Sequence, residues 1–248
     1  YITQLVTSSR VYFLSRPRRF GKSLFLSTLA AYFLGQKELF KDLYLERAEK
    51  ERALQENRSA WQEYPVLYFD FNIGKYTDSG ALNERLHVML SEAESSYGIS
   101  TSKEVQPFFA SRFEKLLKSV FQQTGKQVVI LVDEYDKPLL ETVLDETLND
   151  EIRSQLKSFF EVLKQCDRYI CFALLTGVTK FSKINLFSGA NQLRDISLLD
   201  EFAGVCGFTE QELEQHFTPE IELLAQATKS SVEKTIETLK KKYDGYCF

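Results

Sequence analysis

The chain has 248 residues, of which 44% are apolar, an ordinary composition for a soluble globular protein with one ample core or one large domain plus a small appendage. A net charge of −4 and a pI near 5.5 argue against a surface broadly committed to nucleic acid, although a local basic patch would not show in that sum. The four cysteines form no CxxC pair and only two histidines could join them, so we predict neither a zinc site nor a disulfide framework.

The cellular location is predicted from what the sequence lacks. No apolar run reaches the roughly 18 residues that a membrane span requires, and the start has no signal-peptide layout. We therefore expect a cytoplasmic protein without membrane contact. The chain starts at Tyr1 and ends on the apolar residues Tyr246, Cys247 and Phe248, so we expect a piece of a longer protein.

Strand and helix patterns alternate from the start of the chain. The β-branched, aromatic and aliphatic run 11–15 predicts a strand, Pro17 ends it, and a helical pattern runs from Lys22 to about Leu34. Segment 36–63 is crowded with Lys, Glu and Arg at helical spacing, which indicates a solvated helical insertion more than a partner-binding face. Residues 65–71 predict a second strand.

The middle of the chain continues this alternation, with helices expected at about 80–95 and 105–123. Residues 127–132 are almost wholly apolar, which is typical of a central strand covered on both faces of a parallel sheet. A helix at 150–165 and a further apolar strand at 169–175 follow.

The last part of the chain is less apolar. A weaker strand is expected at 204–208, followed by a helix that starts at Thr209, with Glu212 placed as in a capping box, and by two helices within 219–242. The whole pattern predicts an α/β fold with right-handed crossovers and a mainly parallel sheet. We place the core at 1–208, with the helical insertion near 36–63, and a helical C-terminal extension at 209–248.

Residues 16–23 have the spacing of the Walker A loop, G-x-x-x-x-G-K-[ST], except that Arg16 stands where the first Gly is expected. An apolar strand enters the loop, a helix leaves it, and Arg18, Arg19 and Lys22 gather at the helix start. A helix N-terminus carries roughly half a positive charge, so these cations repel it unless an anion joins them. A bound triphosphate supplies that anion; the alternative is an ordinary Gly-Lys-Ser helix start.

The loop predicts a role for each of its residues. Lys22 is expected to reach the β- and γ-phosphates, the Ser23 hydroxyl to ligate Mg²⁺, and Pro17 to pre-set the backbone where the Gly is missing. The expected nucleotide-binding residues are Arg16, Pro17, Arg18, Arg19, Phe20, Gly21, Lys22, Ser23 and Leu24. No Asn/Thr-Lys-x-Asp segment that reads guanine follows, so we expect ATP as the nucleotide.

An apolar strand that ends in two acids, Asp133 and Glu134, has the Walker B pattern. Asp133 is expected to hold Mg²⁺, mostly through water, and Glu134 to act as the general base on the attacking water. The alternative is that both acids cap the following turn.

Polar residues after the next strand are further candidates. Thr176, before Gly177, has the place of the sensor 1 residue that contacts the γ-phosphate or the lytic water; a turn or cap role is the alternative. Lys180 and Arg194 are cations that either reach the phosphates, in cis or from a neighbouring subunit, or lie solvated at the surface.

With these motifs in place, the sequence resembles the bacterial AAA-ATPase-like family, whose members typically join an ATPase domain to a C-terminal PD-(D/E)xK nuclease-like domain. The resemblance spans nearly the whole chain. The motifs that carry it are Phe13–Ser23, Val132–Pro138, Leu175–Val178, Lys180–Ser182, Cys206–Thr209 and Tyr243–Tyr246.

The resemblance implies a P-loop NTPase fold of three α/β/α layers, and it makes Arg16 a family variant of the loop. It also implies the additional-strand type, with a strand between the Walker A and Walker B strands, as 65–71 would provide. No Asp/Glu-x-Lys triplet occurs in the chain, so no nuclease activity is assigned to these residues.

Three functional hypotheses follow. The first is a Mg²⁺-dependent ATPase module that drives or regulates an attached effector, nuclease-like by resemblance. The second is a nucleotide-dependent switch or scaffold with little turnover that acts through a partner. The third, compatible with both, is a regulator with a DNA-binding basic face. Self-association also stays open.

Overall fold

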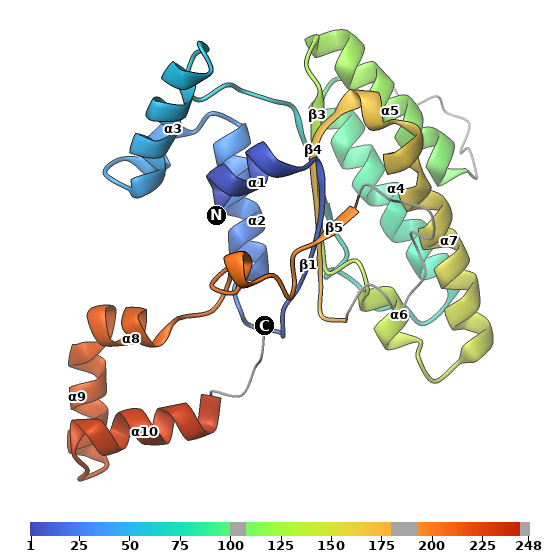
Figure 1. Cartoon of the computed structure of the whole chain (residues 1–248). Helices are drawn as coiled ribbons and strands as arrows, with labels where there is room; N and C mark the ends of the chain where they lie inside the picture. Colours follow the sequence, from blue (N-terminus) through green and yellow to red (C-terminus); the bar gives the residue numbers. More distant parts are fainter. Residues whose placement is uncertain (100–107, 180–192, 244–248) are drawn as a thin grey trace. The chain divides into compact units, whose positions relative to one another are not determined.

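The computed structural model describes residues 1–99, 108–179 and 193–243 (Figure 1). Contacts within the chain group it into two compact units, Tyr1–Ser197 and Leu198–Phe248. The first unit holds the sheet, the loop at residues 16–23 and the acids Asp133 and Glu134, so the candidate site lies within one compact body.

A single sheet of five parallel strands forms the centre of the first unit, in the order β2-β3-β4-β1-β5. The strands are β1 (Val11–Ser15), β2 (Val66–Asp70), β3 (Val128–Asp133), β4 (Ile170–Gly177) and β5 (Leu193–Asp195). The predicted α/β class and parallel sheet are confirmed.

The position of β2 corrects one expectation. A strand does lie between β1 and β3, but it is β4, whereas β2 (the predicted 65–71) lies at the edge of the sheet beside β3. The order of strands along the chain does not determine their order in a sheet, because each parallel pair is joined by a crossover. The sequence also missed β5, which at three residues is too short to leave a pattern.

Helices cover both faces of this sheet and complete the three layers (Figure 1). One face carries α1 (Ile2–Ser8), α2 (Lys22–Phe33) and α3 (Tyr44–Gln55). The other carries α4 (Ser79–Ser96), α5 (Phe109–Thr124) and α7 (Glu146–Gln165), while the short α6 (Lys137–Glu141) follows β3. Residues 105–107 of the helix expected at 105–123 lie outside the described residues.

Among the described residues of the first unit, the remaining helices are the short 3-10 turns η1 (Lys37–Phe40) and η2 (Asp167–Tyr169). Within the described ranges, no helix combines the length and apolarity needed to cross a bilayer.

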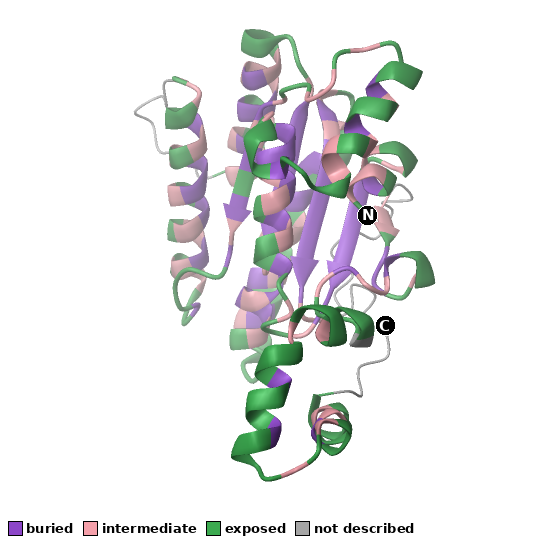
Figure 2. Ribbon diagram, turned by 90° about the vertical axis from the view of Figure 1, so that its left-hand side faces the viewer, coloured by how far each residue is buried: buried purple, intermediate pink, exposed green. Residues whose placement is uncertain are grey.

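The core lies on both faces of the buried strands (Figure 2). Toward α4, α5 and α7, Phe69 of β2 packs edge-on against Phe113, which stacks on Phe159 with ring centroids 4.8 Å apart. Toward α2, Phe33 packs against Phe172 of β4 at 5.1 Å. Because side chains alternate along a strand, each central strand contributes to both halves of the core.

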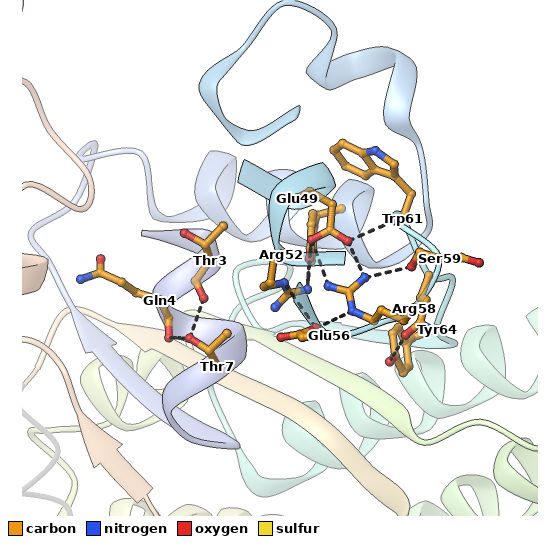
Figure 3. Close-up of polar contacts among 12 residues, drawn as sticks. Thr3, Gln4, Thr7, Glu49, Arg52, Glu56, Arg58, Ser59, Trp61 and Tyr64 are labelled. Atoms are coloured by element: carbon orange, nitrogen blue, oxygen red, sulfur yellow. Dashed lines mark hydrogen bonds and ion pairs between the residues drawn. The ribbon is translucent and has the colours of Figure 1, made fainter. Parts of the chain in front are cut away.

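The charge-rich insertion is anchored by a buried carboxylate, so the expectation of a merely solvated segment is wrong at Glu49. This residue of α3 is 1% exposed and accepts hydrogen bonds from Arg58 (2.7 Å) and the Trp61 amide (3.1 Å) (Figure 3). It also accepts a hydrogen bond from the Tyr32 hydroxyl (2.7 Å). Arg52 adds an ion pair at 3.0 Å. Tyr32 belongs to α2, so this cluster ties the insertion to the helix that starts at the Walker A lysine.

The second unit contains η4 (Asp200–Phe202), α8 (Glu210–His216), α9 (Thr218–Ala227) and α10 (Val232–Tyr243). The predicted capping box is confirmed: Thr209 and Glu212 each accept a hydrogen bond from the other's backbone N–H. The strand expected at 204–208 is absent from this described stretch. Cys206 (φ 70°) and Gly207 (φ 87°) are both left-handed there, a conformation that interrupts a strand.

Candidate functional site

The predicted site residues come together at the carboxyl ends of three neighbouring strands. In the register of the sheet, Ser15 of β1 pairs with Gly177 of β4, and Asp70 of β2 pairs with Asp133 of β3. The loop that follows β1, the acids that end β3 and Thr176 of β4 therefore share one sheet edge. Ligands of open parallel α/β sheets bind at this edge.

The backbone of the loop turns twice through the left-handed region before α2 begins. Arg19 has φ 69°, and Gly21, the N-cap of α2, has φ 90°. Glycine adopts this conformation without the steric cost that a Cβ brings, whereas Arg19 bears that cost. Strained turns of this kind are found at ligand-binding loops, where they direct backbone N–H groups toward one point.

Arg16 stabilises the loop through buried hydrogen bonds to the backbone. Its side chain is buried, its amide donates to the Gly177 carbonyl (3.1 Å), and Nη1 donates to the carbonyls of Ser15 (3.0 Å) and Ser197 (2.8 Å). The residue that replaces the first Walker A glycine thus ties β1 to β4 and to the segment after β5. Its predicted role as a nucleotide ligand stays a prediction.

Lys22 joins the loop after β1 to Glu134 at the end of β3. Its buried ammonium donates to the carbonyls of Arg16 (3.1 Å) and Pro17 (3.2 Å), and Nζ lies 2.9 Å from Glu134 Oε1. Glu134 itself is left-handed, with φ 51°. A strained backbone therefore holds the expected base against the expected phosphate-binding lysine.

Asp133 is held by hydroxyl groups from both neighbouring strands. Thr176 of β4 donates to Asp133 Oδ1 at 2.7 Å, and the Tyr68 hydroxyl of β2 lies 3.5 Å from Oδ2. Asp133 and Thr176 are buried, and Tyr68 is 37% exposed. Burial, together with the nearby charges of Asp133 and Asp70, raises the pKa of Tyr68, so its hydroxyl stays protonated.

Sequence reasoning missed Tyr68. A signal was present, because Tyr68 and Asp70 alternate with apolar residues on β2, and a polar face on a strand otherwise covered by helices marks a surface left open. That face points to the α2 side of the sheet, where Asp133 also lies.

The other predicted loop residues lie at or near the surface. Arg18, Arg19, Ser23 and Leu24 are exposed, with Leu24 at 73%, whereas Pro17 is half-buried. The two arginines therefore place positive charge on the outer side of the loop, around the first turn of α2.

Lys180 and Arg194 were the two further candidate cations of the site. Lys180 lies outside the described residues. Arg194 is in β5 and pairs in register with Tyr12, near the start of β1, whereas the phosphate loop follows the end of β1. The backbone at Arg194 therefore does not lie beside the loop.

The donor set at the site fits Mg²⁺. The part of the chain that the structure describes holds no group of three or more His, Cys, Asp or Glu side chains arranged for a metal ion. Mg²⁺ in nucleotide sites needs fewer protein ligands, since it keeps waters and binds one or two protein oxygens plus phosphate oxygens. Asp133 Oδ2 and the Ser23 hydroxyl are oxygen donors of that class.

Comparison with known proteins shows the family of this chain. A family model described as "Predicted AAA-ATPase" matches residues 1–187. The chain is also similar, at 38% identity over 222 residues, to a protein of Azotobacter chroococcum mcd 1 named "Uncharacterized protein in vnfD 5'region". That match covers 89% of this chain and 40% of the relative, so the chain spans less than half of the relative's length.

Proposed function

Because the chain belongs to the predicted AAA-ATPase family, we propose that it binds ATP with Mg²⁺ at the edge formed by β1, β3 and β4 and hydrolyses it to ADP and phosphate. The observation that carries this proposal is the 2.9 Å contact between Lys22 Nζ and Glu134 Oε1. It brings the proposed phosphate-binding cation and the proposed general base to one point.

The loop supplies the phosphate-binding part of the proposal. N–H groups at the start of α2, the exposed Arg18 and Arg19, and the ammonium of Lys22 are all positive groups at one helix N-terminus. An incoming γ-phosphate competes with Glu134 for Lys22, since the ammonium has only three N–H groups and all have acceptors within the protein. Phosphate binding thereby releases the Glu134 carboxylate.

The released Glu134 then acts as the base. A water oxygen bonds to the γ-phosphorus, the bond from that phosphorus to the β–γ bridging oxygen breaks, and the water proton passes to Glu134. Asp133, with its Oδ1 held by Thr176, and Ser23 are the residues that would hold Mg²⁺. The ion, when bound, neutralises charge on the β- and γ-phosphates. Thr176 thus acts at the site through Asp133.

For the whole protein we propose a cytoplasmic ATPase module that drives or regulates a further domain, nuclease-like by family resemblance. The length of the Azotobacter relative outside the matched region leaves room for such a domain there. The alternative is a nucleotide-dependent switch with little turnover. Glu134 favours the enzyme, because a switch that only binds nucleotide needs no base held at the phosphate-binding lysine.

Calorimetric titration with ATP, GTP and ADP, each with and without Mg²⁺, tests binding. We expect Mg²⁺-dependent ATP binding in the wild type and its loss in Lys22→Ala. Lys118→Met is the matched control, since Lys118 lies on α5 and its ion-pair partner among the described residues is Glu114 of the same helix. A wild type that binds none of the nucleotides would reject the proposal.

Phosphate release in a single turnover separates the ATPase from the switch. We expect Glu134→Gln to bind ATP and to lose hydrolysis by about two orders of magnitude or more, as is typical when a general base is removed. A wild type that binds ATP but shows no turnover would favour the switch.

A further inference from the structure

Asp136 and Lys137, which follow Asp133, Glu134 and Tyr135 in the chain, contact the segments that leave the two strands flanking β3. The first is Asp136, which is fully buried. Its Oδ2 accepts hydrogen bonds from the Val178 amide (3.0 Å), the Thr179 amide (2.7 Å) and the Thr179 hydroxyl (2.5 Å). One carboxylate oxygen therefore fixes the chain where it leaves β4, next to Thr176.

The other oxygen of Asp136 lies against Gly177. A Cβ added to Gly177 would stand 2.7 Å from Asp136 Oδ1 and 2.6 Å from a Tyr135 ring carbon. Oδ1 has no hydrogen-bond partner among the residues that the structure describes. Glycine is therefore needed at position 177 because β4 packs so closely against Tyr135 and Asp136 that no side chain fits between them. Its backbone is not left-handed.

The second residue, Lys137, contacts the opposite loop. Its Nζ donates to the carbonyls of Asn72 (2.5 Å) and Gly74 (3.2 Å) and lies 3.7 Å from Glu141 Oε1. The other oxygen of Glu141 accepts from the Tyr76 amide at 2.9 Å. The loop that follows β2 is therefore fastened to the start of α6 at several points.

We propose that Asp136 and Lys137 are positioning residues that hold the loops after β4 and β2 in register with Asp133 and Glu134. The inference rests on the proposed ATPase function. The two acids and the two positioning residues share one short segment. A shift of Glu134 would therefore strain the contacts of Asp136 with the segment after β4 and those of Lys137 with the loop after β2. The described contacts of Asp136 and Lys137 do not involve the phosphate loop, so these residues act on turnover and leave nucleotide affinity nearly unchanged.

The test compares Asp136→Ala, Asp136→Asn and Lys137→Met with the wild type and with Lys118→Met. In Asp136→Ala we expect kcat to fall by about 10-fold or more, because small misplacements of catalytic groups have effects of this order. The Kd for ATP stays within about 3-fold. Asp136→Asn keeps an acceptor oxygen for the Val178 and Thr179 amides and recovers most of kcat. Lys137→Met lowers kcat in the same way.

Hydrogen exchange followed by mass spectrometry supplies a readout that does not depend on activity. Exchange should quicken at residues 176–179 in Asp136→Ala and at 71–76 in Lys137→Met, each without the other. Unchanged exchange and kcat in both variants would overturn the proposal, as would affinity falling in step with kcat. If Asp136→Ala does not fold, Asp136→Asn and Lys137→Met decide. If the wild type hydrolyses no ATP, the proposed function fails and the exchange pattern still tests the positioning role.

Discussion

The Thr176 hydroxyl donates a 2.7 Å hydrogen bond to Asp133 Oδ1 across the neighbouring strands β4 and β3. Both side chains are buried, and the same hydroxyl also lies 3.3 Å from the Val132 carbonyl. Thr176 therefore fixes the orientation of the Asp133 carboxylate: Oδ1 accepts the Thr176 hydrogen bond, and Oδ2 lies toward Tyr68.

Replacing Thr176 with Val removes this hydrogen bond and keeps the side-chain shape. Leaving Asp133 Oδ1 buried without a partner should lower the free energy of unfolding by about 1–3 kcal/mol. The Mg²⁺ concentration for half-maximal ATP hydrolysis should rise, because the carboxylate is free to rotate. Urea unfolding and a Mg²⁺ titration measure the two effects. Thr176→Ser keeps the hydroxyl and serves as control; a Val variant with unaltered Mg²⁺ dependence contradicts the prediction.

Arg16→Met should lower the melting temperature of the protein, with a smaller effect on the affinity for ATP. The carbonyls of Ser15 and Ser197 lose their charged donor, at a cost of about 1–3 kcal/mol. The matched change Arg18→Met removes an exposed cation, so the melting temperature should hold while ATP affinity falls. Thermal unfolding with and without ATP compares the two variants. Equal melting temperatures for both would contradict a stabilising role of the Arg16 hydrogen bonds.

Gly177→Ala places a methyl group within 2.7 Å of Asp136 and Tyr135 and should force the strand ends apart. Overpacking of this kind typically lowers the free energy of unfolding by about 1–3 kcal/mol. Gly80→Ala in α4 is the comparison, since its new methyl meets only the Asp78 side chain, at 3.0 Å. Chemical denaturation of both variants is the measurement. A Gly177→Ala protein as stable as Gly80→Ala refutes the packing argument.

Glu49 makes the stability of the insertion depend on pH. Burial alone would raise its pKa, but hydrogen bonds from Arg58, Tyr32 and the Trp61 amide outweigh burial and hold the pKa below the usual 4.5. A folded-state pKa below the unfolded one adds stability above pH 4.5, and this stability is lost as the pH falls through the folded value. Glu49→Gln should therefore cost about 3–5 kcal/mol near neutral pH and progressively less as the pH falls through the folded-state pKa of Glu49.

Trp61 reports this effect directly, because it is the sole tryptophan and its amide contacts Glu49. Fluorescence-monitored unfolding of wild type and Glu49→Gln across this pH range measures the difference. Glu46→Gln is the control: Glu46 lies on the same helix, and its ion pair with Lys50 is exposed. A difference between wild type and Glu49→Gln that does not shrink in acid would show that the charge of Glu49 is not the cause.

The parts of the fold with strong local patterns were predictable. The apolar runs of β1, β3 and β4 and the helical spacing of α2 and α7 correspond closely to the observed elements. The capping box at Thr209 was also readable, since it depends on residues three apart. These features arise from contacts local in the chain or from burial on both faces.

The features of the fold that the sequence did not predict depend on contacts between distant segments of the chain. The edge position of β2 and the existence of β5 are set by which strands the crossovers bring together. The hydrogen bond from the Arg16 guanidinium to the Ser197 carbonyl could not be predicted, because Ser197 lies far along the chain. Glu49 looked solvated for a similar reason, as Arg58 and Tyr32 become its partners only in the fold.

The sheet order has a consequence for synthesis of the chain. β1 precedes the phosphate loop, yet its strand partners are β4 and β5, which lie late in the first unit. As the chain leaves the ribosome, β2 and β3 can pair well before β1 finds any neighbour. Because β4 lies between β1 and β3 in the sheet, the candidate site can take its final form only after β4 has been synthesised.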